Sequence, residues 1–210
     1  SSSRDSLFID VSVIGECESG RAVTRRGAKV GDRIYVSGSL GASALGLSLL
    51  EGGFRLNESH DVSDAKRQAV LKHLSPEPQL KLGRAIGEAG LATAMIDISD
   101  GLSTDLRHIL DESGVGAFIH AAAIPVAECV LAAAAGAPGI DPLSLALNGG
   151  EEYELLFTVR PENHERVVAL AETLGATITV IGDIVAEKQS HLERNGTIES
   201  FQPLGYQHSI

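Results

Sequence analysis

The chain has no tryptophan, a single methionine and two cysteines, and aromatic residues make up only 4% of its 210 residues. The two cysteines, Cys17 and Cys129, are far apart and lack the close spacing of a metal-binding pair. This usage excludes a disulfide framework and a zinc site from the expected chemistry. It favours a reducing compartment, so we expect a cytoplasmic location.

Long apolar runs are also missing. No stretch approaches the roughly 20 residues that cross a bilayer, and no signal peptide is visible. Basic residues are scarce, because 17 Lys and Arg stand against 28 Asp and Glu, which gives a formal net charge of −11. This balance argues against a nucleic-acid binder. We therefore expect neither a nucleic acid nor a membrane as a partner.

The remaining composition is that of a globular protein, with 43% hydrophobic residues. The length suits one large domain, or one domain and a fragment of another. Periodicity predicts strands over 33–37, 115–121, 153–160 and 177–184, a further strand ending at Asp97, and helices over 42–50, 64–74, 79–89, 102–112, 126–135, 142–147 and 161–174. Asn195-Gly196 predicts a type I′ hairpin near the end. We therefore expect an α/β fold with a mixed sheet and flanking helices.

The beginning of the chain suggests a missing neighbour. Residues 7–14 alternate like a strand, yet no initiator methionine precedes them and the next convincing strand begins at Arg33. Because a strand at an extreme terminus needs partners, we expect that the first part of the protein is absent. The glycine-rich, basic residues 20–31 are expected to connect two units.

The most informative stretch is Met95-Ile96-Asp97-Ile98-Ser99-Asp100-Gly101-Leu102, where a strand is expected to end and a helix to begin. Alternation places Asp97 and Ser99 on one face of the strand. Two carboxylates and a hydroxyl then meet at the positive end of a helix, where Mg²⁺ and phosphate can bind. The same pattern also fits Asp100 as a simple helix N-cap and Asp97 as an exposed strand residue.

A second cluster is Asn148-Gly149-Gly150-Glu151-Glu152-Tyr153-Glu154-Leu155-Leu156-Phe157. Paired glycines let the backbone turn sharply or approach a ligand. The residues alone favour a solvated turn with a charged strand entry. The alternative is a carboxylate held beside flexible backbone and directed toward a cationic ligand. Arg25 leaves a similar choice between a solvated loop residue and a phosphate contact.

Together these two clusters resemble the thiamine-monophosphate kinase family, in the superfamily that includes aminoimidazole ribonucleotide synthetase. The similarity runs essentially from end to end, and supporting matches are Gly20-Arg21-Ala22, Arg25, Gly27-Ala28, Gly31-Asp32, Tyr35-Val36-Ser37-Gly38 and Gly205-Tyr206-Gln207-His208. The resemblance implies that residues 28–210 form a C-terminal domain of the synthetase-like type. Residues 1–27 would then hold a remnant strand of an N-terminal ATP-binding domain and the connection.

The resemblance also implies a reaction. A member of this family is a phosphotransferase that moves the γ-phosphoryl group of ATP onto the phosphate of thiamine monophosphate, giving thiamine diphosphate and ADP. Both partners are anionic, so several Mg²⁺ ions would offset their repulsion. Direct transfer needs no protein nucleophile, and we expect no catalytic residue of that kind. The full-length protein is expected to be a homodimer.

Residue roles follow from the same resemblance. Asp97 and Asp100 correspond to magnesium ligands, and Arg25 and Ser99 correspond to contacts with ATP. Acidic magnesium-binding segments of the family would precede Ser1. The fragment alone is therefore expected to have little or no kinase activity.

Two further residues correspond to contacts with thiamine monophosphate. These are Glu151 and Tyr206, and a carboxylate and an aromatic face suit a thiazolium cation. The chain departs from the family pattern where Gln207 replaces Asp, Ser209 replaces an aromatic residue and Glu152 stands where Asp is more usual.

Two rival interpretations remain, namely another ATP-dependent enzyme of the superfamily and a non-catalytic module that binds a thiamine phosphate.

Overall fold

A seven-stranded mixed sheet forms the centre of the computed structural model, which describes residues 10–56, 64–137 and 139–205. The strands are β1 (Arg33–Ser37), β2 (Ala92–Asp97), β3 (Gly116–His120), β4 (Leu155–Val159), β5 (Ile178–Val185), β6 (His191–Arg194) and β7 (Thr197–Ser200). Their order in the sheet is β2-β4-β1-β5-β3-β6-β7. β3 and β6 pair in parallel, and the other neighbours pair antiparallel. The predicted mixed sheet is confirmed.

Seven α-helices flank this sheet in the described ranges. They are α1 (Ala42–Glu51), α2 (Asp64–Leu74), α3 (Leu80–Glu88), α4 (Leu102–Ser113), α5 (Glu128–Gly136), α6 (Pro142–Asn148) and α7 (His164–Thr173). The helix expected over 161–174 begins later, because Pro161–Asn163 forms a separate 3-10 turn before α7. None of the helices in these ranges has the length and apolar character that crossing a bilayer requires.

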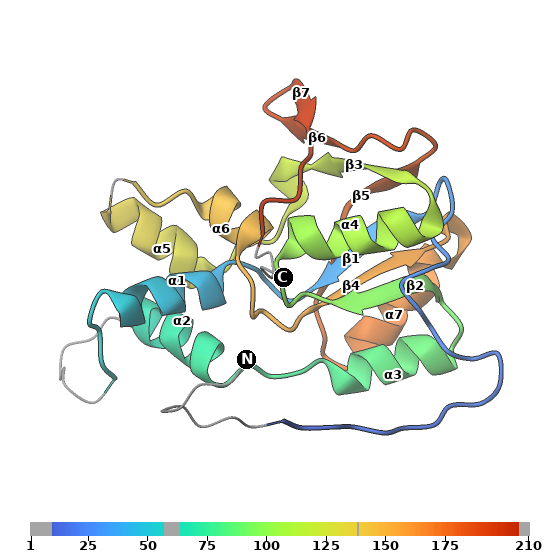
Figure 1. Ribbon diagram of the computed structural model, residues 1–210, viewed down its shortest axis with the longest axis horizontal. Helices are drawn as coiled ribbons and strands as arrows, with labels where there is room; N and C mark the ends of the chain where they lie inside the picture. Colours follow the sequence, from blue (N-terminus) through green and yellow to red (C-terminus); the bar gives the residue numbers. More distant parts are fainter. Residues whose placement is uncertain (1–9, 57–63, 138, 206–210) are drawn as a thin grey trace.

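Around β1 the sheet is covered on both faces, as the alternating side chains of β1 show. Ile34 and Val36 are fully buried in the core that α4 covers. Tyr35 points to the opposite face, where α3 and α7 pack, and its ring stacks on Phe157 with centroids 5.3 Å apart. Figure 1 shows α4 along one face of the sheet and α3 with α7 along the other. The apolar periodicity of the strands thus encodes a three-layer arrangement.

A separate helical cluster lies at one end of the sheet, at the left of Figure 1. There α1, α2 and α5 share a small apolar core that includes Leu45, Ala69 and Val130. α1 and α2 approach closely because Gly46 packs on the backbone of Ala69, where any side chain would collide. This cluster matters for function because α1 forms one wall of the cavity described below.

The strand expected over 7–14 is wrong for its described part, residues 10–14. These residues form no strand, and Val11, Val13 and Ile14 are 77%, 89% and 97% exposed. Alternation alone does not make a strand, since an isolated one lacks partners for its backbone groups. Figure 1 shows this segment, in dark blue, passing beneath α3. The expected division between residues 27 and 28 stays a prediction.

The hairpin near the carboxyl end agrees with its prediction. Asn195 and Gly196 have φ values of 53° and 78°, the positive values that a type I′ turn requires. They connect β6 to β7, in which Arg194 pairs with Thr197.

Candidate functional site

The two clusters singled out in the sequence lie side by side, because the pairing of β2 with β4 continues beyond both strands. The amide of Ile98 donates to the carbonyl of Glu154 at 2.8 Å. The amide of Tyr153 donates back to the carbonyl of Ile98, also at 2.8 Å. The amide of Glu151 then donates to the carbonyl of Ser99 at 2.8 Å. The end of β2 and the loop before β4 therefore form one hydrogen-bonded unit.

The loop in this unit adopts an uncommon backbone conformation. Glu151 and Tyr153 have φ values of 62° and 52°, which non-glycine residues rarely adopt. The hydroxyl of Tyr153 donates to Oε2 of Glu151 at 2.9 Å. Such local strain persists only where surrounding contacts enforce it, and it is common at ligand sites. Here the bonds to Ile98 and Ser99 enforce it.

Two glycines allow the backbones to meet this closely. A Cβ atom on Gly150 would lie 2.6 Å from the carbonyl oxygen of Ser99. A Cβ atom on Gly101 would lie 2.9 Å from the carbonyl of Asn148, and Gly101 has a φ of 108°. Larger residues at either position would separate the two segments. The glycines of both motifs thus serve close approach, as their residue types suggest.

Asp105 is a site residue that sequence reasoning missed. It is 1% exposed in the first turn of α4, and its Oδ2 accepts the backbone N–H groups of Ser99 and Asp100, both at 3.0 Å. The N-cap of α4 is Gly101, with no side-chain capping bond, so the interpretation of Asp100 as the N-cap is wrong. Asp105 lies among the apolar residues of α4, so no sequence signal indicated its role. Its burial is explained only by the loop that packs on it.

Carboxylates are crowded at this junction. Burial raises the pKa of Asp105 to about 6, although its two backbone hydrogen bonds lower it, and the nearby charges of Asp100 and Asp97 raise it further. Ligand atoms of Asp100, Asp105 and His108 lie within 4.8 Å of one another. Carboxylate oxygens are the donors that Mg²⁺ prefers, and a cation would relieve their repulsion. Two carboxylates of this group are donors of the kind that Mg²⁺ takes, and Asp97 is not among its three members.

A cavity of about 960 Å³ opens beside this junction. One wall is the face of α1 that carries Leu47 and Glu51, and His73 of α2 adjoins it. The opposite wall is formed by Ser99–Asp100 and by Gly149–Glu151. Apolar surface and several carboxylates thus face the same space, which suits an organic cation.

The structure brings together four of the six predicted site residues. Ser99, Asp100 and Glu151 line the cavity, and Asp97 is exposed at the end of β2 beside them. Asp97 raises the pKa of Tyr153 through its charge, after the larger effects of Glu151 and burial. The roles given to these residues stay predictions, but their convergence supports a shared site.

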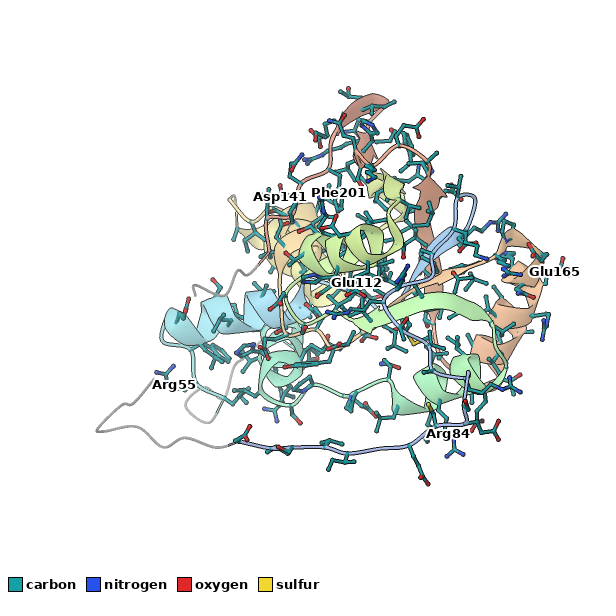
Figure 2. All side chains as sticks on the ribbon, turned by 45° about the vertical axis from the view of Figure 1, so that its right-hand side comes forward. Arg55, Arg84, Glu112, Asp141, Glu165 and Phe201 are labelled. Carbon is teal, nitrogen blue, oxygen red and sulfur yellow. The ribbon has the colours of Figure 1, made fainter. Side chains whose placement is uncertain are left out.

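The other two predicted residues are not placed in this cavity. Arg25 forms an ion pair with Glu112 at 3.0 Å, near the last turn of α4, whereas Asp100 precedes the first turn. Glu112, labelled in Figure 2, stands 10 positions after Leu102, so about 15 Å of helix separates Arg25 from the cavity. Tyr206 lies outside the described residues.

The glutamates of the second cluster divide into two kinds. Glu151 is exposed, whereas Glu152 and Glu154 are 0% and 4% exposed. The interpretation as a solvated turn is therefore wrong for these two. Glu154 binds Nζ of Lys72 at 2.7 Å and accepts the hydroxyl of Ser37 at 2.6 Å. The signal that could have found them is period-two spacing, since both share the parity of buried Leu156.

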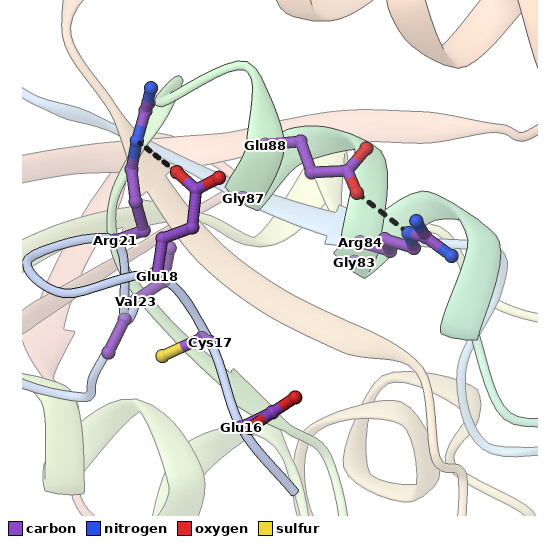
Figure 3. Close-up of a pocket in the computed structure, with 10 residues that line it drawn as sticks. Glu16, Cys17, Glu18, Arg21, Val23, Gly83, Arg84, Gly87 and Glu88 are labelled. Carbon is purple, nitrogen blue, oxygen red and sulfur yellow. Dashed lines mark hydrogen bonds and ion pairs between the residues drawn. The ribbon is translucent and has the colours of Figure 1, made fainter.

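A second cavity, of about 660 Å³, lies between residues 16–23 and α3. Figure 3 shows that its arginines are already paired within their own segments. Arg21 lies 3.7 Å from Glu18, and Arg84 lies 2.7 Å from Glu88. Because both guanidinium groups are neutralised locally, this cavity is the weaker candidate for an anionic ligand.

Fold and site together define a class of protein. It is a mixed α/β domain with a cavity where a strand end that bears carboxylates meets a glycine-containing loop. A comparison with protein families identifies the group. The sequence model described as "AIR synthase related protein, C-terminal domain" matches residues 29–195, and the chain belongs to this family.

Curated and solved relatives are consistent with that assignment. The thiamine-monophosphate kinase of Salmonella typhimurium is 35% identical over 206 residues, which are 98% of this chain and 61% of that protein. The crystal structure of thiamine-monophosphate kinase from Stenotrophomonas maltophilia superposes with a TM-score of 0.75 at 33% identity, over 83% of this chain and 54% of that one. A structure described as AaThiL complexed with AMPPCP and TMP gives a TM-score of 0.74 at 30% identity, over 89% and 54%. The chain thus spans less than two thirds of these relatives.

The two hydrogen bonds that Asp105 accepts from the backbone lead to a prediction about stability. Asp105→Ala leaves the amides of Ser99 and Asp100 without their acceptor, so we expect the free energy of unfolding to fall by about 1–3 kcal/mol. Asp111→Ala on the same helix removes only an exposed ion pair with Arg107, and should change it by about 0.5 kcal/mol or less. Urea unfolding of both variants at pH 5, below the raised pKa of Asp105, measures the difference. Equal effects would show that the Asp105 bonds do not hold the junction.

Proposed function

We propose that the full-length protein containing this chain is a thiamine-monophosphate kinase. It would transfer the γ-phosphoryl group of ATP to the phosphate of thiamine monophosphate, and release thiamine diphosphate and ADP. One observation carries the proposal: Asp97–Gly101 and Gly149–Glu154 are hydrogen-bonded to each other at one cavity. These are the segments on which the resemblance to the kinases rests.

The cavity offers complementary chemistry for both ends of thiamine monophosphate. The exposed carboxylate of Glu151 would face the cationic thiazolium ring, and the apolar part of α1 around Leu47 would pack on the uncharged ring. The phosphate would lie toward Ser99 and the amino end of α4, where a bound cation would offset the nearby carboxylates. Support thus comes from charge and shape on the same surface.

Asp97 and Asp100 are the residues that would hold magnesium in this proposal. The bound metal supplies charge neutralisation between the two phosphate-bearing substrates. The protein residues would orient the phosphates, and no side chain would serve as a nucleophile. The homodimer, the role of Arg25 with ATP and the role of Tyr206 with the substrate belong to the same proposal, as does a cytoplasmic location.

The test is an assay of the full-length protein with ATP, MgCl₂ and thiamine monophosphate. We expect ADP and thiamine diphosphate to form in equal amounts, measured by a coupled ADP assay and by chromatography. ADP release that does not depend on thiamine monophosphate would point instead to another ATP-dependent reaction of the superfamily. Tight binding in calorimetry without any turnover would indicate a non-catalytic module.

Asp97→Asn in the full-length protein tests the magnesium role. We expect kcat to fall on the order of 100-fold, because the metal that would neutralise the phosphates loses one charged ligand. Folding should be unaffected, since Asp97 is exposed. Asp183→Asn, at another exposed aspartate on a strand, β5, serves as the control and should leave kcat unchanged. An unchanged rate in Asp97→Asn would remove this residue from the site.

A further inference from the structure

Glu152 is buried beside the cavity, and the proposed contacts with substrate do not use it. Its side chain is 0% exposed, although the preceding residue, Glu151, is exposed at the cavity. Its Oε1 accepts the backbone N–H groups of Gly41 at 2.7 Å and of Ser43 at 3.0 Å. These amides belong to the amino end of α1, which lacks a capping side chain of its own at Gly41. Glu152 thus supplies the cap from a distant segment.

The two bonds join opposite walls of the cavity. α1 presents Leu47 and Glu51 to the cavity, and the Gly149–Glu151 loop forms the facing wall. The walls touch directly near Gly149, where an added Cβ atom would lie 2.7 Å from Cβ of Ala44. A carboxylate anchored between them therefore determines how far apart they stand.

A second carboxylate reinforces this anchor from the same strand entry. Glu154 pairs with Lys72 of α2 at 2.7 Å, and the hydroxyl of Ser43 and Nδ1 of His73 share a hydrogen bond of 3.0 Å. α1 and α2 are therefore attached to the loop as one hairpin. The contact of Lys72 with Glu154 thus ties α2 to the start of β4 by a polar link.

The anchor is electrostatically unfavourable for the folded state. Oε2 of Glu152 has no hydrogen-bond partner among the described residues. Burial raises the pKa of Glu152 to about 7, against the lowering effects of its backbone bonds and of Lys72, while the charge of Glu154 raises it further. Cys129 of α5 also faces it, and the charge of Glu152 adds to the burial that raises the pKa of that thiol. A buried carboxylate with one unpaired oxygen is not what stability alone would select.

We propose that Glu152 is a positioning residue that clamps the amino end of α1 to the loop carrying Glu151 and so sets the width of the substrate cavity. It does not touch the substrate. The identity of that substrate, thiamine monophosphate, rests on the proposed function. The clamp itself can be measured without turnover.

The central experiment compares Glu152→Gln with Glu152→Asp and with Glu172→Gln, an exposed residue of α7. In Glu152→Gln the charge-assisted bonds to α1 become weaker neutral ones. At pH 8.5 we expect faster amide hydrogen exchange at Gly41, Ser43 and Glu151 in this chain. In the full-length enzyme we expect a KM for thiamine monophosphate raised about tenfold, with the KM for ATP within about twofold. Glu152→Asp keeps the charge and should restore most of the affinity, and Glu172→Gln should match the wild type.

The pH dependence separates a positioning role from a merely structural one. Because the pKa of Glu152 is about 7 in the folded state and 4.5 ordinarily, folding takes up a proton between these values. Its contribution to stability is therefore present below pH 4.5 and lost as pH rises through 7. At pH 8.5 Glu152→Gln should unfold no more easily than the wild type while binding substrate less tightly. At pH 6 the KM values of the two should converge.

Two results would overturn the proposal. One is unchanged amide exchange together with an unchanged KM in Glu152→Gln at pH 8.5. The other is a loss of affinity that accompanies an equal loss of stability at every pH. If the full-length protein shows no turnover of thiamine monophosphate, the proposed function fails, and amide exchange still decides whether the clamp exists.

Discussion

The hydrogen-bonded ladder between β2 and β4, prolonged beyond the ends of both strands, is the contact on which the rest of the site depends. Without the bonds from Glu151 and Tyr153 to the 98–99 segment, the left-handed conformation of the loop would relax. The half-buried carboxylate of Asp100 and the exposed carboxylate of Glu151 would then lose their common cavity. A cavity assembled from segments about 50 residues apart is thus held by a few backbone contacts in an antiparallel sheet.

The same arrangement occurs twice beside this ladder: an acid that lines the cavity, Asp100 or Glu151, stands next to a buried acid that accepts backbone amides. Asp105 accepts the amides of Ser99 and Asp100, and Glu152 accepts two amides of α1 behind Glu151. Burial raises the pKa of both supporting carboxyl groups. Ionisation of these two buried groups therefore lowers the stability of the folded state at neutral pH. Their bonds to backbone amides fix the arrangement of the acids that line the cavity.

Much of the fold could be predicted from sequence, because burial imposes a period of two on strands such as β1 and of 3.6 on helices such as α4. The segment 10–14 shows the limit, since its alternation is genuine but no described strand lies beside it to pair. Asp97 and Glu151, which are exposed, could be predicted because they belong to two sequence motifs that contain glycines. Asp105 and Glu152 were missed because what they bind, amides of other segments, is decided only by tertiary packing.

The most direct test of a single shared site is amide chemical-shift mapping of the ¹⁵N-labelled full-length protein, titrated with thiamine monophosphate in the presence of Mg²⁺ and a non-hydrolysable ATP analogue. The shared site predicts that shifts concentrate on 98–101 and on 149–153, and that both segments titrate with one apparent Kd. Shifts confined to residues 16–23 and α3, with both of these segments unaffected, would contradict it.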